Sequence, residues 1–594
     1  MCGIAGIFAY GGNAPPVDRD CLGRMGGAMV PRGPDGDGAW FSGNDRIGFG
    51  HRRLSIIDLS DGGAQPMLLD GGRFSITYNG EIYNFRALRD ELEAAGRTFE
   101  SDSDTEVLLH LYDRHGPDMV EKLRGMFALA IYDRDQGGVF LARDGFGIKP
   151  LYYADDGATF RFASQVKALL AGGGIDTAPS AAGRSGFFVW GYVPEPWTMF
   201  DKIRALPAGS TMWIDARGAR SPTRYFDVTE ALEIAADAPV SWTRDDLREA
   251  LLDTLRHHLV ADVPVGAFLS AGLDSATIVG LTSEIQADAL RSVTLAFDEF
   301  DGTRFDEAAL AEKIAVHYDT AHRTQRVKGA DFQDEYVRLC AAMDQPSIDG
   351  VNTYFVSKVT AETGLKVAMS GLGGDELFGG YQSFREIPKM TGVLGAIPGM
   401  RYAGTLFRKL AAPAVSAVTS PKYASLFEYG TTYPDAYLLR RALFMPWELP
   451  KLMDPDMASS GWAELEEGSF RRGQVDRLKT PRAKVSALES TWYMRSQLLR
   501  DSDWAGMAHS LEIRVPLVDT FFFRQLAPML ASDTPPGKLD MAASPARPLP
   551  NEVLNRPKTG FAVPMRDWLL KGDPTATERG FRGWARKIAE DCYT

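Results

Sequence analysis

Cys2 is the residue whose position in this sequence most directly suggests chemistry. It follows Met1 and precedes the small residue Gly3, so removal of Met1 would leave it as the N-terminal residue. Its own α-amine, with a pKa of about 8, could then accept the thiol proton and leave a nucleophilic thiolate. Taken alone, a cysteine here is more readily explained as a small core residue at the start of a strand. The motifs that follow decide between the two interpretations.

Five motifs follow one another in the first part of the chain. Together they resemble the N-terminal-nucleophile glutaminase domain, and the resemblance covers about the first 200 residues. One departure is Pro31, where that family more often has histidine; it affects a loop and leaves the nucleophile in place. The motifs are MCGIAGIF at the start, RGPDG at 32–36, HRRLSIID at 51–58, YNGEIYN at 78–84 and SDTE at 103–106.

The resemblance implies a glutamine-binding site around Cys2. Arg53 would pair with the α-carboxylate of glutamine and Asp104 with its α-amine, as expected for a guanidinium and a carboxylate. Asn79 and Gly80 would form the oxyanion hole, with a side-chain amide and a backbone N–H directed at the developing alkoxide. The catalytic residues of this domain would be Cys2, Asn79 and Gly80, and the glutamine-binding residues Arg53, Leu54, Ser55, Ile56, Ile57, Asn79, Gly80, Glu81 and Asp104.

A second candidate site begins with FLSAGLDSATIV at 268–279. The segment places a serine and glycine turn between a buried strand and a helix, where backbone N–H groups can bind phosphate. The hydroxyls of Ser270 and Ser275 would add to this anion site, and Asp274 could help to hold Mg²⁺. The turn resembles the Ser-Gly-Gly-x-Asp-Ser loop of ATP pyrophosphatases, with Ala271 in place of the first glycine.

Three later segments extend this second site. MSGLGGDELFGGY at 369–381 is another glycine turn, with Asp375 and Glu376 as possible ligands of a second Mg²⁺. With DWAGMAHSLEIRVPLVD at 503–519 and NRPKTGFAVPMRDWL at 555–569, it resembles the C-terminal domain of the glutamine-hydrolysing (B-type) asparagine synthetase family. The resemblance implies that Lys558 is catalytic, that Asp274 and Asp375 hold the metal, and that ATP contacts Leu269, Ser270, Gly272, Asp274, Ser275, Leu295, Ser370 and Gly371.

The two resemblances together imply one reaction at two sites. Glutamine would lose ammonia at Cys2, and the ammonia would cross an internal passage to a carboxylate that ATP has activated as an acyl-adenylate. Aspartate is the acceptor in most of the family. Two positions depart from the family pattern near the expected acceptor pocket: Leu372 replaces a glutamate, and Trp504 replaces an arginine. A leucine cannot accept a proton or pair with an ammonium, so the identity of the acceptor stays open.

Other functions are compatible with parts of this pattern. The runner-up is a related amidotransferase acting on another carboxylate, such as a uronic acid sugar or a small metabolite. A β-lactam-forming synthetase shares the architecture but has no need of Cys2, Arg53, Asn79 and Asp104. A non-catalytic amino-acid or nucleotide sensor would have little use for the complete set of chemically active residues.

The elements needed to position these residues differ between the two halves of the chain. The first half shows short apolar runs separated by glycine-rich turns, whereas helices alternate with short buried strands after about residue 241. Alternation of this kind predicts a parallel sheet with crossover helices. We expect an N-terminal αββα glutaminase sandwich over 1–210, a linker over 211–240 and a parallel-sheet α/β ATP-pyrophosphatase synthetase domain over 241–594.

Composition limits the setting in which this chemistry would occur. A length of 594 residues predicts two or more globular domains. The formal charge of −13 argues against binding of nucleic acid or anionic membranes over the surface as a whole, although it leaves room for local basic patches. The four cysteines, Cys2, Cys21, Cys340 and Cys592, are too scattered to indicate a disulfide framework or a zinc site. No secretory signal or membrane span is evident. We expect a cytoplasmic enzyme that uses ATP and Mg²⁺, takes small-molecule substrates and, from the family, forms a homodimer.

Overall fold

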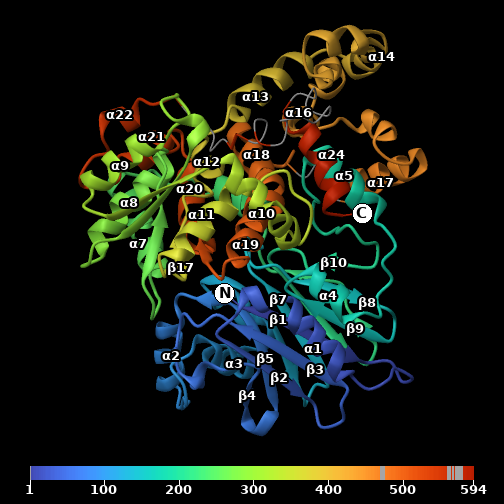
Figure 1. The fold of residues 1–594 in the computed structure, drawn as a ribbon, viewed down its shortest axis with the longest axis vertical. Helices are drawn as coiled ribbons and strands as arrows, with labels where there is room; N and C mark the ends of the chain where they lie inside the picture. Colours follow the sequence, from blue (N-terminus) through green and yellow to red (C-terminus); the bar gives the residue numbers. More distant parts are fainter. Residues whose placement is uncertain (1, 469–474, 558–562, 565–567, 569–579, 594) are drawn as a thin grey trace.

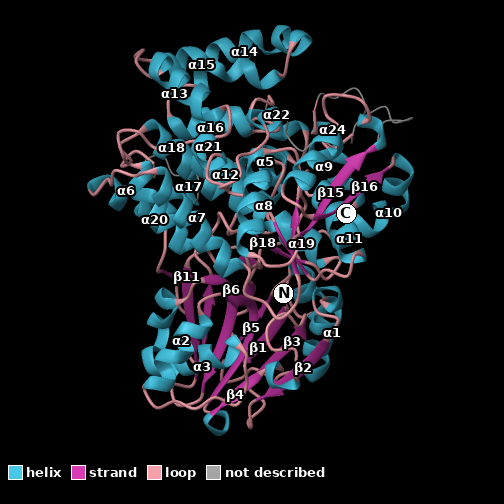
Figure 2. Cartoon of the chain, turned by 90° about the vertical axis from the view of Figure 1, so that its left-hand side faces the viewer, coloured by secondary structure: helices cyan, strands magenta, loops and turns pink. Residues whose placement is uncertain are grey.

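The computed structural model describes residues 2–468, 475–557, 563–564, 568 and 580–593. Two parts are evident in Figure 1: antiparallel sheets formed by the first part of the chain lie below, and the helix-rich remainder lies above. Figure 2 shows the strands of both parts meeting near the middle of the molecule. The N-terminus lies at this junction, so Cys2 is placed beside the second part.

The N-terminal part consists of two antiparallel sheets packed face to face between two pairs of helices. The first sheet has the order β10-β8-β9-β1-β3-β2 and is covered by α1 and α4; the second has the order β12-β11-β7-β6-β5-β4, with β13 beside β11, and is covered by α2 and α3. The predicted αββα sandwich is thus confirmed. Its elements are β1 (Gly3–Ala9), α1 (Arg19–Ala28), β2 (Gly36–Phe41), β3 (Ile47–Arg53), β4 (Met67–Leu69), β5 (Phe74–Ile82), α2 (Phe85–Ala94), α3 (Asp104–His115), β6 (Gly125–Asp133), β7 (Gly138–Arg143), β8 (Tyr152–Asp155), β9 (Thr159–Ala163), α4 (Val166–Gly172), β10 (Arg204–Ala205), β11 (Ser210–Asp215), β12 (Gly218–Ala219) and β13 (Thr223–Arg224).

Strand β1 explains why the chain begins with an almost unbroken apolar run. Side chains of a strand point alternately to its two faces. Ile4 and Phe8 pack into the core between the two sheets, whereas Ala5 and Ile7 pack against α1 and α4 on the other face. Both faces of β1 are therefore buried, and the strand holds the N-terminal residue firmly in place.

The C-terminal part is built on a parallel sheet of order β16-β15-β14-β17-β18, which confirms the predicted fold class. Strand order reverses next to β14, and such a reversal opens a crevice at the carboxyl ends of the strands. The sheet elements and the helices around them are α7 (Arg244–His258), β14 (Val265–Phe268), α8 (Leu273–Ile285), β15 (Arg291–Phe297), α9 (Ala308–His317), β16 (Ala321–Val327), α10 (Gly329–Ala342), α11 (Val351–Glu362), β17 (Val367–Met369), α12 (Gly374–Phe378), α19 (Arg500–Met507), β18 (Glu512–Arg514), α20 (Thr520–Leu530), α21 (Lys538–Ala542), α22 (Asn551–Leu554) and α24 (Arg582–Asp591).

The segment 211–240, interpreted above as a linker, is largely ordered into regular structure. It contains most of β11, all of β12 and β13, and helix α6 (Val228–Asp237). Asp227 caps α6 by accepting hydrogen bonds from the backbone N–H groups of Thr229 and Glu230. The division of the chain into domains by residue number stays a prediction.

A helical region between β17 and β18 extends from the synthetase part to the end of the molecule opposite the N-terminal sheets (Figures 1 and 2). No helix within the described ranges is long and apolar enough to cross a lipid bilayer. The elements of this region, with α5 from the end of the N-terminal part, are α5 (Ala181–Trp190), α13 (Ser383–Leu394), α14 (Met400–Val418), α15 (Leu426–Tyr429), α16 (Tyr433–Arg441), α17 (Pro455–Gly468), α18 (Pro481–Leu488) and a π-helix (Glu489–Leu499).

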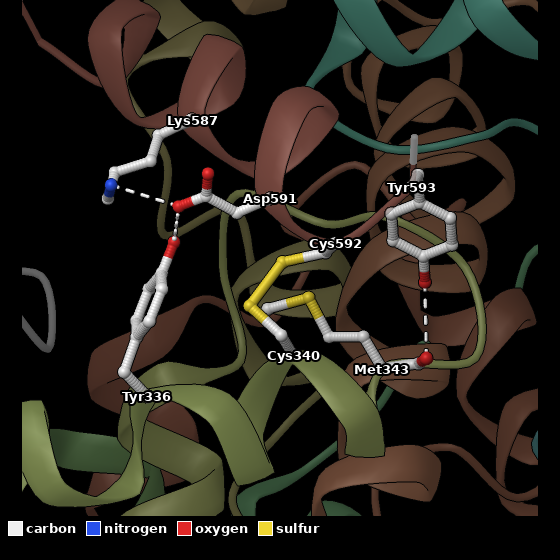
Figure 3. Close-up of a disulfide and its surroundings, with 7 residues drawn as sticks. All are labelled: Tyr336, Cys340, Met343, Lys587, Asp591, Cys592 and Tyr593. Carbon is white, nitrogen blue, oxygen red and sulfur yellow. Dashed lines mark hydrogen bonds and ion pairs between the residues drawn. A yellow bond between two sulfur atoms is a disulfide. The ribbon is translucent and has the colours of Figure 1, made fainter.

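One feature contradicts the interpretation of the cysteines. Cys340 on α10 and Cys592, directly after α24, form a disulfide although they lie 252 residues apart in sequence (Figure 3). Nearby, the hydroxyl of Tyr593 donates to the carbonyl oxygen of Met343, 3.1 Å away, and also ties the C-terminus to the end of α10. The two cysteines meet because α24 packs against α10, and their distance along the sequence gives no indication of this contact. Cys2 and Cys21 are free and buried.

Candidate active sites

Cys2 lies directly before β1 and is held from the neighbouring sheet. Its backbone N–H donates to Oδ1 of Asn79 on β5, 2.9 Å away, and its Sγ lies 4.0 Å from the carbonyl oxygen of Leu54. Burial raises the pKa of the Cys2 thiol above its ordinary value, although the positive N-terminus opposes this shift. The thiol is therefore protonated at rest, and a base beside it is required before it can attack.

Asn79 and Gly80, the residues predicted to form the oxyanion hole, follow one another on β5, and the side chain of Asn79 contacts Cys2. The Nδ2 group of Asn79 is buried and has no hydrogen-bond partner among the residues that the structure describes, so a donor is available for a developing negative charge. A Cβ atom at Gly80 would lie 2.2 Å from the carbonyl oxygen of Met126, so only glycine allows β5 and β6 to approach this closely.

The two residues expected to bind the charged ends of glutamine differ in their surroundings. Asp104, the first residue of α3, accepts hydrogen bonds from the Tyr78 hydroxyl and the Ile82 N–H, both at 3.0 Å. Burial raises its pKa to about 6, so the carboxyl is mainly ionised at neutral pH. Arg53, at the end of β3, donates instead to the loop carbonyl oxygens of Ser60 and Asp58. A glutamine carboxylate would have to share or replace these bonds.

The segment after Arg53 forms one wall of this region. Leu54, Ile56 and Ile57 are buried, whereas the backbone N–H of Ser55 donates to Asp35, 2.8 Å away. None of these residues has a charged side chain, so contact with glutamine, as predicted for them, would use only their shape and their backbone groups.

Glu81 belongs to the interface between the two parts of the molecule. Its Oε2 lies 3.7 Å from Nη2 of Arg514, and Nε of Arg514 donates to Glu512, 2.7 Å away, on β18. All three side chains are buried. Burial and the charge of Glu512 raise the pKa of Glu81 well above its usual range. Of the two glutamates beside Arg514, Glu81 is therefore the protonated one, and Glu512 carries the negative charge that balances Arg514.

Arg32 makes a second connection between the two parts of the molecule. Its guanidinium forms two hydrogen bonds to Asp503 of α19, at 2.6 and 2.9 Å, and its Nε donates to the carbonyl oxygen of Cys2, 3.1 Å away. Arg32 and Asp503 are both buried. Sequence reasoning placed Arg32 and Asp503 in two separate motifs; that the motifs bind each other could not be inferred from their order.

The second site is a cavity of about 540 Å³ at the carboxyl ends of β14 and β17, where the strand order reverses. Its walls are formed mainly by the two glycine turns that follow these strands. All of the residues expected to contact ATP line it, namely Leu269, Ser270, Gly272, Asp274, Ser275, Leu295, Ser370 and Gly371.

Local hydrogen bonds shape the first turn as a phosphate site. The hydroxyls of Ser270 and Ser275 lie 2.9 Å apart, and the Ser270 N–H donates to the Ser275 hydroxyl, 3.1 Å away. Helix α8 begins at Leu273, so its N-terminus faces the cavity and favours an anion. A Cβ atom at Gly371 would lie 2.8 Å from the Cβ of Asp274, which explains the glycine in the second turn.

The ammonium group of Lys538 lies between two carboxylates of this cavity. Its ammonium contacts both Asp274 and Asp375, with 2.8 Å to the latter. Although burial opposes it, the two carboxylates raise the pKa of Lys538, which therefore stays charged. Two carboxylates that share one cation and face a phosphate site are a suitable oxygen donor set for Mg²⁺. Lys538 lies in none of the recognised motifs, so sequence reasoning missed it.

The acceptor side of the cavity carries carboxylates that the sequence did not single out. Leu372 lines the cavity, whereas Trp504 is buried behind it and donates from Nε1 to Oδ1 of Asp501, 2.8 Å away. Asp501 and Asp349 both line the cavity. Burial, with the charge of Asp349 nearby, raises the pKa of Asp501 to about 7. Acidic groups are thus present near Leu372, although position 372 supplies none. Lys558 lies outside the described residues.

Comparison with known proteins agrees with both sites. Residues 1–226 match the glutamine amidotransferase domain family and residues 246–579 the asparagine synthase family. Glutamine-hydrolysing asparagine synthetase 1 of Bacillus subtilis is 32% identical over 606 aligned positions, which cover 100% of this chain and 90% of that protein. The chain belongs to the glutamine-hydrolysing asparagine synthetase family.

Two further relatives show how widely the similarity extends across this family. Asparagine synthetase 3 of Bacillus subtilis is 31% identical over 87% of this chain and 79% of its own length. Asparagine synthetase B of Escherichia coli is 31% identical over 65% of this chain and 66% of its own length. Membership in the family makes this chain an ATP-dependent ligase with glutamine as the amide donor.

Proposed function

We propose that this enzyme converts aspartate to asparagine with ammonia taken from glutamine. The observation that supports this most directly is the buried connection from Cys2 through Arg32 to Asp503. Asp503 lies on α19, whose Asp501 and Ser502 line the ATP-type cavity of the same chain. The names of the relatives supply the acceptor, aspartate.

Ammonia release begins with attack of Cys2 Sγ on the carboxamide carbon of glutamine. The α-amine of Cys2, free after removal of Met1, takes the thiol proton and later gives it to the leaving ammonia. The negative charge on the carbonyl oxygen is stabilised by Nδ2 of Asn79 and the N–H of Gly80. Water then hydrolyses the thioester, which releases glutamate and restores the thiol. Arg53 and Asp104 hold the α-carboxylate and α-amine of the substrate.

Amide formation takes place in the cavity of the second site. The acceptor carboxylate attacks the α-phosphorus of ATP, and pyrophosphate leaves; ammonia then attacks the acyl carbon, and AMP leaves. The turn at Ser270 to Ser275 binds phosphate oxygens. Asp274 and Asp375 would hold Mg²⁺, whose charge would offset that of the phosphates. We assign Lys558 to stabilising the adenylate, as the family resemblance implies, and Lys538 to keeping the two carboxylates together before the nucleotide binds.

An acceptor screen tests this proposal. The full chain is incubated with glutamine, ATP, Mg²⁺ and a panel of carboxylates that includes aspartate, and products are identified by mass spectrometry. Asparagine formed together with glutamate, AMP and pyrophosphate supports the proposal. A different amide as the main product would instead favour another carboxylate acceptor and would explain Leu372. Absence of both glutamine hydrolysis and pyrophosphate release from folded protein would favour a sensor.

We further place the enzyme in the cytoplasm, where glutamine and ATP are available, and expect a homodimer from the family. The Cys340–Cys592 disulfide is unusual for a reducing compartment. Alkylation of thiols at the moment of cell lysis, followed by mass spectrometry of the two cysteine peptides, shows whether this pair is oxidised in the cell. Light scattering of the purified chain gives its oligomeric state.

A further inference from the structure

One segment of the helical region differs sharply in charge from the rest of the chain. Residues 387–427, which we call the basic arm, contain five lysines and arginines and no aspartate or glutamate. The average of the chain, 78 acidic residues in 594, would give about five acidic residues in a stretch of this length. The net charge argues against anionic partners over the surface as a whole, and this segment is one of the local basic patches with which it remains compatible.

Within the basic arm, helix α14 turns an apolar face to solvent. Tyr402, Leu406 and Leu410 follow one another at intervals of four residues, so they lie on one side of the helix, and they are 84%, 62% and 75% exposed. Val393, before α14, is 65% exposed. Exposed apolar side chains that gather on one face of a helix mark an interaction surface.

The opposite face of α14 is the one that packs on the protein. A Cβ atom at Gly404 would lie 2.3 Å from the backbone N of Glu428, so α14 lies directly against α15. Arg408 donates from Nε to the carboxylate of Glu428, 2.5 Å away. Arg408 is thus turned toward the protein, whereas Tyr402, Leu406 and Leu410 are turned toward solvent.

Cations lie beside the apolar face. Lys409, next to Leu410, is exposed and forms no ion pair within the described part of the chain, and Lys389 is exposed on α13. Arg401, next to Tyr402, lies 3.8 Å from Asp435 and is partly exposed. Apolar side chains flanked by lysine and arginine are typical of helices that lie on an anionic lipid surface.

We propose that the basic arm docks the enzyme on the surface of an anionic lipid bilayer. Charge favours this occupant over a second copy of the chain, because a two-fold contact between identical arms would bring like charges together. Position also fits: α14 lies at the end of the molecule farthest from the N-terminal sheets, where a flat surface can approach it (Figures 1 and 2). Because no described helix can span a bilayer, the arm lies on the membrane and does not cross it.

Docking would bring one active site close to the membrane. Arg385, on α13 just before the basic arm, lines the ATP cavity. The N-terminal sheets, which carry the predicted glutaminase site, lie at the end of the molecule opposite α14 (Figure 1). The arm would therefore hold the synthetase half near the lipid and leave the N-terminal half facing the solution.

Vesicle co-sedimentation of the full chain tests the proposal. We expect binding to phosphatidylcholine vesicles that contain phosphatidylglycerol, weaker binding to pure phosphatidylcholine, and loss of binding as salt is raised. The double variant Leu406→Asn/Leu410→Asn should bind at least about tenfold more weakly, since two apolar side chains no longer enter the lipid. Lys409→Glu should weaken binding to the anionic vesicles alone, also by about tenfold.

A matched control distinguishes binding by this surface from non-specific binding of any exposed apolar side chain to lipid. Val316→Asn/Val337→Asn removes two apolar side chains of similar exposure, 77% and 76%, on α9 and α10, outside the arm, and should bind as the original chain does. All variants should keep the thermal unfolding temperature of the original chain, because the residues changed are exposed. No binding to anionic vesicles, or equal loss in the control variant, would overturn the proposal. So would self-association that depends on Leu406 and Leu410 without any binding to vesicles.

Discussion

The glutaminase site and the ATP cavity are held together by different means. At the first, β1 and β5 place Cys2 and Asn79 in contact through a buried hydrogen bond. At the second, two turns carry Asp274 and Asp375, and the ammonium of Lys538 holds these carboxylates together. The first site is therefore preformed by its sheets, whereas the second depends on a cation that can be exchanged. A covalent nucleophile needs fixed geometry, while a site for nucleotide and metal needs balanced charge.

The sharpest way to separate the two sites is Cys2→Ala. Asparagine formation from glutamine should fall by a factor on the order of ten thousand, because no other group can form the thioester. Formation from added ammonium chloride should continue at the original rate, since the ATP cavity is untouched. Both rates are measured by mass spectrometry of the product. Loss of the ammonium-driven reaction in a folded variant would contradict independent sites.

The connection between the sites is tested by Asp503→Asn. Removal of one charge leaves Arg32 buried without its counter-ion and should lower the free energy of unfolding by about 3–5 kcal/mol. The carbonyl of Cys2 would also lose a fixed partner, so more glutamate should form per asparagine. Denaturant titration and product ratios measure the two effects.

An exposed ion pair provides the control for that measurement. Glu552→Gln breaks the contact of 2.7 Å between Glu552 and Lys313, both more than half exposed. The change in the free energy of unfolding should stay below about 1 kcal/mol. Equal effects of the two substitutions would mean that the buried pair does not tie the domains together.

The charge balance of the ATP cavity is tested by Asp274→Asn. Pyrophosphate release should fall by a factor of about a hundred to a thousand, because one ligand of the metal and one partner of Lys538 lose their charge. Hydrolysis of glutamine should continue. If both reactions fell in proportion, the two sites could not be regarded as separately assembled.

The titration of Asp501 should make the free energy of unfolding depend on pH. Its pKa of about 7 in the folded state exceeds the value of about 3.9 in an unfolded chain, so the folded protein retains a proton that the unfolded chain loses. The stabilisation is complete below about pH 4 and is lost as the pH rises through 7. Relative to Asp501→Asn, the original chain should lose roughly 4 kcal/mol of its free energy of unfolding across this window, because the two pKa values differ by about 3 and each pKa unit corresponds to about 1.4 kcal/mol. Denaturant titration measures this loss. If the free energy of unfolding changed with pH in the same way for the original chain and for Asp501→Asn, the raised pKa of Asp501 would be contradicted.

The sequence was sufficient for the chemistry of each site taken separately. Cys2, Asn79 and the turns around Asp274 and Asp375 belong to local motifs whose meaning depends on neighbouring residues. Strand and helix periodicity indicated a β-rich first part and a parallel sheet in the second, because burial of apolar faces fixes these patterns. The family resemblance implied the sandwich. Family membership then identified the reaction class.

Only the tertiary structure decided how distant segments meet. Arg32 and Asp503 lie 471 residues apart, and Lys538 lies 264 residues from Asp274, so no local pattern could pair them. The disulfide between Cys340 and Cys592 and the outward apolar face of α14 are also products of packing. Local sequence determines which groups are present and the element that carries each one. Contacts between elements depend on how whole domains pack, and that is a property of the complete chain.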